Sequence, residues 1–112
     1  MSKKEYYQSA ENVEKFKMLS ELLDSIYLEM KEFSKKKPDE PLNTFKCKNV
    51  NRVLTQLQEL LNEEPTIGFL DLLDEETLPT NSDAILVIGQ YQASMKRYYN
   101  KYTDTYRNWN IK

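Results

Sequence analysis

The spacing of apolar residues predicts a long amphipathic helix near the start of the chain. Between residues 9 and 36, apolar side chains recur at intervals of three and four positions, which places them on one face of a helix. These residues are Phe16, Leu19, Leu23, Ile26, Met30 and Phe33, with Leu22 and Tyr27 widening the stripe. Ser9 is suited to cap the first turn, and the lysines that end the segment suit the negative end of a helix dipole. We therefore expect a helix over about residues 9–36.

Proline residues divide the rest of the chain into three further pieces. All four prolines lie between periodic segments, and a proline inside a helix would cost about 3 kcal/mol. We expect a medium helix over about residues 49–62, a short helix over about 66–74, and a second long helix over about 82–108. The two long helices are expected to pack antiparallel, while the two shorter ones cover the remaining side.

These four pieces predict an all-α, single-domain antiparallel helical bundle over residues 1–112. A chain of 112 residues has the size of one domain and can bury a core without a metal or a disulfide. Only two glycines are present, which disfavours tight hairpins and phosphate-binding glycine loops. We expect the two ends, residues 1–8 and 109–112, to be disordered.

The end of the last predicted helix is rich in aromatic and basic residues. At about 100° per residue, most of the aromatic side chains continue an apolar face that starts at Ala84, and the basic ones point away from it. A buried tyrosine hydroxyl needs a hydrogen-bond partner, so such a face suits either a core or an interface between proteins. Both interpretations stay open. The predicted interaction residues are Tyr98, Tyr99, Tyr102, Tyr106 and Trp109, with Arg97, Lys101 and Arg107 at the rim.

The net charge of −2 is unevenly distributed along the chain. Residues 49–83 hold one basic and eight acidic residues, whereas residues 84–112 hold five basic and one acidic. This contrast is compatible with pairing within the bundle or between subunits, although a solvated mixed-charge surface is the simpler interpretation. It also leaves nucleic-acid binding by the basic, tyrosine-rich last helix as an alternative, although the pI of about 5.2 disfavours it.

The residue types restrict the catalytic chemistry that the chain can perform. It has no histidine and a single cysteine, Cys47, which excludes Ser–His–Asp and Cys–His arrangements and histidine-based metal sites. A remote alternative is a magnesium-dependent nucleotide pyrophosphatase of the helical type, which holds the metal with paired carboxylates. The acidic residues available for it are Glu59, Glu63, Glu64, Asp71, Asp74, Glu75 and Glu76. Their positions at helix ends and in loops disfavour such a site.

Together these patterns predict a small non-catalytic protein that acts by binding another protein. We expect a regulatory or accessory role, of the kind common among small bacterial and phage proteins, and self-association as a dimer. We expect no cofactor and no metal. The absence of a long apolar run or an apolar signal segment, together with the single cysteine, predicts a cytoplasmic protein without a membrane span.

Overall fold

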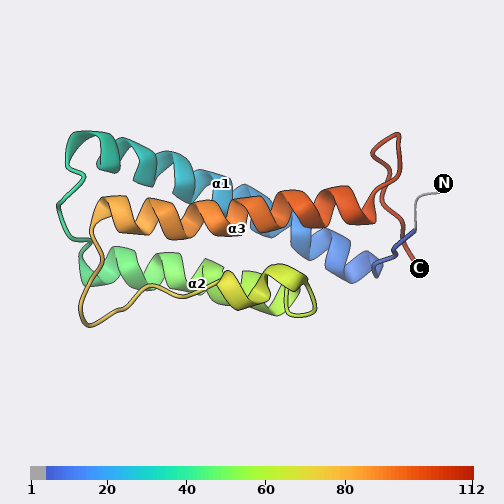
Figure 1. Ribbon diagram of the computed structural model, residues 1–112, viewed down its shortest axis with the longest axis horizontal. Coiled ribbons are helices and arrows are strands. Elements are labelled where there is room, and N and C mark those ends of the chain that lie inside the picture. Colours follow the sequence, from blue (N-terminus) through green and yellow to red (C-terminus); the bar gives the residue numbers. More distant parts are fainter. Residues whose placement is uncertain (1–4) are drawn as a thin grey trace.

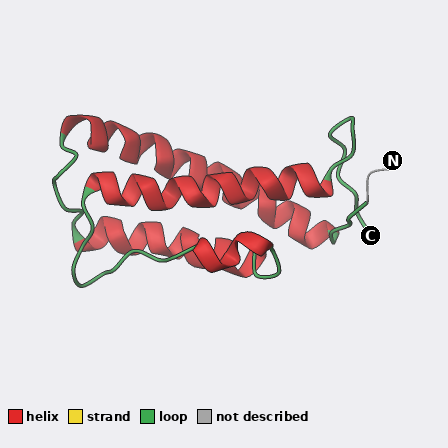
Figure 2. Ribbon diagram, in the orientation of Figure 1, coloured by secondary structure: helices red, strands yellow, loops and turns green. Residues whose placement is uncertain are grey.

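The computed structural model describes residues 5–112 as three α-helices and one short 3-10 helix. The elements are α1 (Ala10–Lys36), α2 (Thr44–Leu60), η1 (Pro65–Phe69) and α3 (Asn81–Tyr102). Figure 2 shows loops between them, and the described part forms only isolated bridges in place of a sheet. The predicted all-α bundle is confirmed. Residues 1–4, which belong to the expected disordered N-terminus, lie outside the described residues.

The helices form an elongated bundle in which α1 runs antiparallel to both α2 and α3 (Figure 1). The chain reverses after α1 to enter α2, and residues 61–80 then return beside α2 to the start of α3 (Figure 1). The antiparallel packing expected for the two long helices is therefore present. The return segment takes the place of a fourth helix.

Helix α1 begins and ends at the positions that the apolar pattern and the Ser9 cap predicted. The Ser9 hydroxyl accepts a hydrogen bond from the backbone N–H of Asn12 at 3.1 Å, which satisfies one of the free donors of the first turn. Leu19, Leu23 and Met30 of the predicted stripe are buried. The prediction for residues 9–36 is confirmed.

Helix α2 begins five residues before the predicted start at residue 49. Asn43 caps it, because its side-chain oxygen accepts a hydrogen bond from the Lys46 N–H at 2.8 Å. Cys47 then adds a buried position one turn before Asn51. The lysines on either side of Cys47 hide this turn from a pattern based on strongly apolar residues.

The predicted helix over residues 66–74 is wrong beyond its first turn. Only Pro65–Phe69 is helical, and the chain then extends along α2. The Asn51 side chain accepts from the Leu73 N–H at 2.9 Å and donates to the Leu73 carbonyl at 2.8 Å. Gln58 donates to the Leu70 carbonyl at 2.8 Å. Side chains of α2 thus satisfy backbone groups that would otherwise bond within a helix.

The last helix ends at Tyr102, six residues before the predicted end at residue 108. The Asp104 carboxylate accepts hydrogen bonds from the backbone N–H groups of Tyr106 and Asn108, at 2.8 and 2.9 Å. Arg107 adopts the left-handed region with φ 67°, and a bridge joins Thr103 to Trp109. A tight turn stabilised by an aspartate therefore replaces the final helical turns.

The two ends of the described chain pair with each other. The Gln8 N–H donates to the Asn110 carbonyl, and the Lys112 N–H donates to the Gln8 carbonyl, both at 2.9 Å. Both ends lie at one end of the bundle in Figure 1. Residues 5–8 and 109–112, for which we expected disorder, thus have defined partners in the structure.

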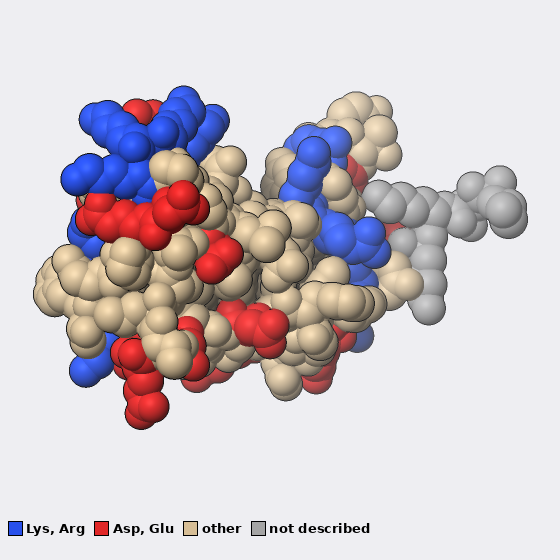
Figure 3. All heavy atoms as spheres, turned by 60° about the vertical axis from the view of Figure 1, so that its left-hand side comes forward, with Lys and Arg blue, Asp and Glu red and all other residues tan. Residues whose placement is uncertain are grey.

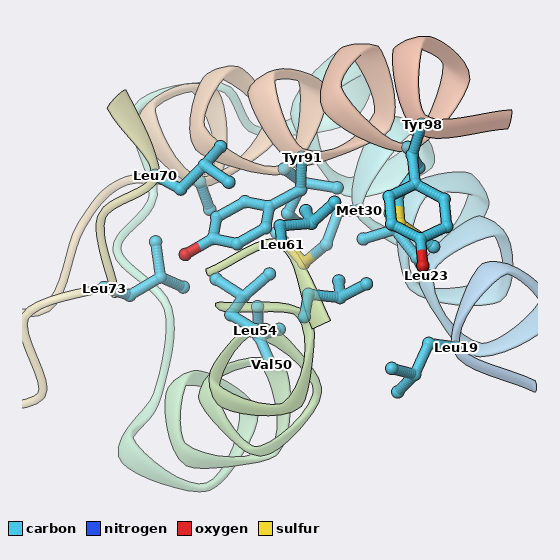
Figure 4. Close-up of a cluster of buried hydrophobic side chains, with 14 of the residues drawn as sticks. Leu19, Leu23, Met30, Val50, Leu54, Leu61, Leu70, Leu73, Tyr91 and Tyr98 are labelled. Atoms are coloured by element: carbon cyan, nitrogen blue, oxygen red, sulfur yellow. The ribbon is translucent and has the colours of Figure 1, made fainter. Parts of the chain in front are cut away.

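The core lies where α1, α2, α3 and the return segment meet (Figure 4). Tyr91 and Tyr98 are its largest fully buried side chains. Tyr91 points towards Leu70 and Leu73, and its hydroxyl donates to the Asp71 carbonyl at 2.8 Å. This bond fastens the return segment to α3. Within the described helices, none has the length and apolar character needed to cross a membrane.

Candidate interaction surfaces

Two of the predicted interaction residues, Tyr98 and Tyr102, belong to the core. Their exposed fractions are 1% and 6%. The Phe16 ring stacks on Tyr98 with ring centroids 5.4 Å apart, and the Tyr98 and Tyr102 centroids are 4.6 Å apart. In the structure these two tyrosines lie in the core, because α1 covers the apolar face that they extend.

The Tyr102 hydroxyl joins a polar network that crosses the bundle. It donates to Glu64 Oε2 at 2.8 Å, and Lys101 Nζ lies 3.2 Å from Glu64 Oε1. Lys101 Nζ also lies 4.7 Å from the centroid of the Tyr6 ring. Burial and the hydrogen bond to Glu64 raise the pKa of Tyr102. Lys101 thus acts within the chain as a partner of a buried carboxylate.

The Tyr98 hydroxyl has no hydrogen-bond partner among the described residues. Burial raises the pKa of Tyr98 strongly, and the nearby Tyr102 and Glu64 add to the shift. An unpaired buried hydroxyl costs stability. The ring packs on Phe16, and the hydroxyl is an unsatisfied group of the core.

The remaining aromatic residues of the predicted set surround the turn after α3. Trp109 folds back onto the bundle, with its ring centroid 4.9 Å from Phe16 and 5.4 Å from Tyr99. Arg107 lies over the Tyr99 ring at 5.7 Å. Tyr106 is 84% exposed at the tip of the turn. The structure therefore brings Tyr99, Arg107 and Trp109 together and separates Tyr106 from them.

Arg97 and the acidic residues of the middle segment are mostly exposed. Arg97 lies on the solvent side of α3. The Glu75 carboxylate accepts from the Asn51 amide at 2.8 Å, and Asp74 accepts from the backbone N–H groups that follow it, which lowers its pKa. Within residues 5–112, no three acidic or cysteine side chains lie together as a group that could hold a metal ion. These carboxylates serve turns and loop attachments.

A group of basic side chains marks the end of the molecule where α1 ends (Figure 3). Lys35 pairs with Glu32 at 3.7 Å, and Lys37 pairs with Glu40 at 3.5 Å. Exposed pairs of this kind contribute little to stability. Lysines at a helix C-terminus are favoured by the helix dipole, which accounts for their position.

An apolar groove lies between α1 and α2, on a side that no other element covers. It has a volume of about 810 Å³. Three of its large apolar side chains are well exposed: Met18 at 52%, Leu22 at 46% and Phe45 at 73%. Ile26 and Val53 form part of its floor and are half-buried. This is a continuous apolar surface of the kind that marks binding sites for proteins.

Three charged side chains line the same groove. Glu29 comes from α1, whereas Lys46 and Arg52 come from α2. Lys46 Nζ lies 3.9 Å from the centroid of the Phe33 ring and so bridges the groove at one end. Glu29 and Arg52 are exposed and form no ion pair with any described residue. The groove thus has an acidic group on one wall and basic groups on the other.

Sequence reasoning did not identify this groove. The sequence signal for the groove was weak: Leu22 widens the apolar stripe of α1, and Met18 lies one turn before Leu22. Phe45 lies before the predicted start of α2, so its position on a helix could not be inferred. No protein-family model, curated protein or solved structure matches the chain.

Proposed function

We propose that the protein is a non-catalytic binding protein that holds a helix of a protein partner in the groove between α1 and α2. The observation that carries this proposal is the exposure of Met18, Leu22 and Phe45 along a groove of about 810 Å³. Grooves between two helices accept the apolar face of an amphipathic third helix. A regulatory or accessory role in the cytoplasm agrees with this mode of action.

The groove replaces the aromatic end of α3 as the proposed contact surface. Tyr98 and Tyr102 are buried and present no free surface, and the ammonium group of Lys101 is engaged by Glu64. The same burial weakens the nucleic-acid alternative, because stacking on bases requires open aromatic faces. Tyr106, Arg97 and Arg107 are exposed but form no shared pocket with the groove.

A photo-crosslinking amino acid tests the proposal with a matched pair of positions. Phe45 lies in the groove and is 73% exposed; Phe69 lies in η1, outside the groove lining, and is 71% exposed. A benzophenone side chain at position 45 should give a discrete adduct in the native cells. If the partner is a second copy of the chain, the purified protein should give the adduct as well. The same group at position 69 should give none. Leu22→Asp should suppress the adduct at position 45.

Absence of an adduct at position 45, or equal adducts at the two positions, would refute the groove as the binding surface. Circular dichroism of each variant controls for folding. Because Phe45 and Phe69 are both exposed phenylalanines, a difference between them reports on location and not on general reactivity.

A further inference from the structure

We infer that the partner helices at the α1–α2 groove are α1 and α2 of a second copy of this chain, related by a two-fold axis parallel to the helices. The inference rests on the proposed function, since it names the partner of that groove. Two copies would then pack α1 and α2 of one subunit against α2 and α1 of the other as a four-helix bundle.

The directions of the helices favour this arrangement. Helices α1 and α2 are antiparallel across the groove (Figure 1). A two-fold axis along the groove places α1 of one copy against α2 of its partner, again antiparallel. Every neighbouring pair in this bundle is then antiparallel, the arrangement common in four-helix bundles.

The charges of the groove are complementary under this symmetry. Phe33 and Lys46 are in contact across the groove, with Lys46 Nζ 3.9 Å from the ring centroid. Glu29 lies four residues before Phe33 on α1, and Arg52 lies six residues after Lys46 on α2. At 1.5 Å per residue their heights along the groove differ by only about 3 Å. A parallel two-fold axis preserves these heights, so Glu29 faces Arg52 of the partner subunit, and the contact occurs twice.

The exposed apolar residues lie towards the two ends of the same groove: at 1.5 Å per residue, Leu22 and Met18 are about 16 to 22 Å along α1 from Phe33, whereas Phe45 adjoins Lys46. Met18 and Leu22 line the α1 wall, and Phe45 lines the α2 wall. In the dimer each wall meets the opposite wall of the partner, so the exposed apolar side chains of both copies are removed from water together. A two-fold axis perpendicular to the helices would place α1 on α1 and so would not bring the acidic wall of one copy onto the basic wall of the other.

The test is a charge exchange between two variants, read by sedimentation of the purified full chain. Wild type should sediment as twice 13.3 kDa. In a dimer of the Glu29→Arg variant, an arginine at position 29 faces Arg52 of the other copy at both contacts. In a dimer of the Arg52→Glu variant, Glu29 faces a glutamate at position 52 at both contacts. Each single variant should dissociate at least tenfold more readily. An equimolar mixture of the two should form a heterodimer, since both of its contacts again join opposite charges.

Glu21→Arg, on the exposed side of α1 outside the groove lining, is the matched control and should remain dimeric. A wild type that is monomeric at all accessible concentrations would overturn the inference. Single variants that dimerise as strongly as wild type would also overturn it, and so would an equimolar mixture that stays monomeric. A monomer that still gives a foreign adduct from position 45 would refute the dimer while leaving the proposed function intact. A wild-type dimer that gives no adduct from position 45, but gives one from 69, would refute both.

Discussion

The Tyr102 hydroxyl donates a hydrogen bond of 2.8 Å to the carboxylate of Glu64, which is only 8% exposed. The two residues are 38 positions apart, and the bond connects the last turn of α3 to the residue that precedes η1. Lys101 Nζ, 3.2 Å from the same carboxylate, supplies the positive charge that allows it to remain in a nearly dry site.

Glu64→Ala should lower the free energy of unfolding by about 2 kcal/mol, because it leaves the buried Tyr102 hydroxyl without its acceptor. Urea unfolding followed by circular dichroism measures the change. The neighbouring Glu63 is exposed, and Glu63→Ala should change stability by less than about 0.5 kcal/mol. Equal losses in the two variants would mean that the network contributes nothing.

Tyr98→Phe should leave stability unchanged or raise it by up to about 1 kcal/mol, because it removes a hydroxyl that has no partner and keeps the ring. Tyr91→Phe is the control: it removes a hydroxyl that donates to the Asp71 carbonyl, and it should cost about 1 kcal/mol. Both are measured by urea unfolding. A Tyr98→Phe variant that is destabilised as much as Tyr91→Phe would show that the Tyr98 hydroxyl is bonded in solution.

The bundle should unfold in alkali as its buried tyrosines are forced to ionise. Burial raises the pKa of Tyr91 from 10.0 to about 12, and it also raises the pKa values of Tyr98 and Tyr102. The folded state therefore holds these protons more tightly than the unfolded state. Their contribution to stability is fully present below pH 10.0 and is lost as the pH rises towards 12.

Each tyrosine that must ionise on unfolding should lower the free energy of unfolding by roughly 1.4 kcal/mol per pH unit in this range. Tyrosinate absorbance and helical circular dichroism, recorded on one sample, provide the check. Part of the tyrosinate signal should appear only together with the loss of helix. Complete tyrosine titration while the helices persist would contradict the burial of these residues.

Trp109→Ala should destabilise the protein by about 1–2 kcal/mol, because the indole packs against Phe16 and Tyr99. Tyr106→Ala, in the same turn, should change stability by less than about 0.5 kcal/mol, since this ring is 84% exposed. Thermal unfolding of the two variants compares them directly. The reverse order would show that the turn after α3 packs differently.

The parts of the fold that depend on local signals could be predicted from the sequence. The start of α1 follows from the Ser9 cap and its core face from a regular apolar stripe. The burial of Tyr98 agrees with the core interpretation of the last helix, and Pro65, the first residue of η1, marks a real break after α2. In these cases neighbouring residues alone determine the backbone.

The parts that failed depend on contacts between distant residues or on competition within a turn. Residues 70–74 have apolar character typical of a helix, but Asn51 on α2 binds the backbone of Leu73 from 22 positions away. Asp104 captures the N–H groups of a turn that the periodic pattern would continue as a helix. The groove was missed for a related reason: it exists only because no element covers the α1–α2 side, which periodicity cannot reveal.

The single cysteine lies under the return segment, where it is fully buried and its Sγ donates to the Asp74 carbonyl at 3.6 Å. Burial, with the nearby Glu75 and Asp74, raises the pKa of the Cys47 thiol, so its reaction with a thiol reagent requires the segment to move away from α2. The labelling rate in the folded protein therefore reports the frequency of that local opening. Cys47 is the only thiol in the chain, so it can be labelled without engineering. Its labelling rate would show whether a partner bound in the groove, on the other side of α2, slows the movement of the return segment.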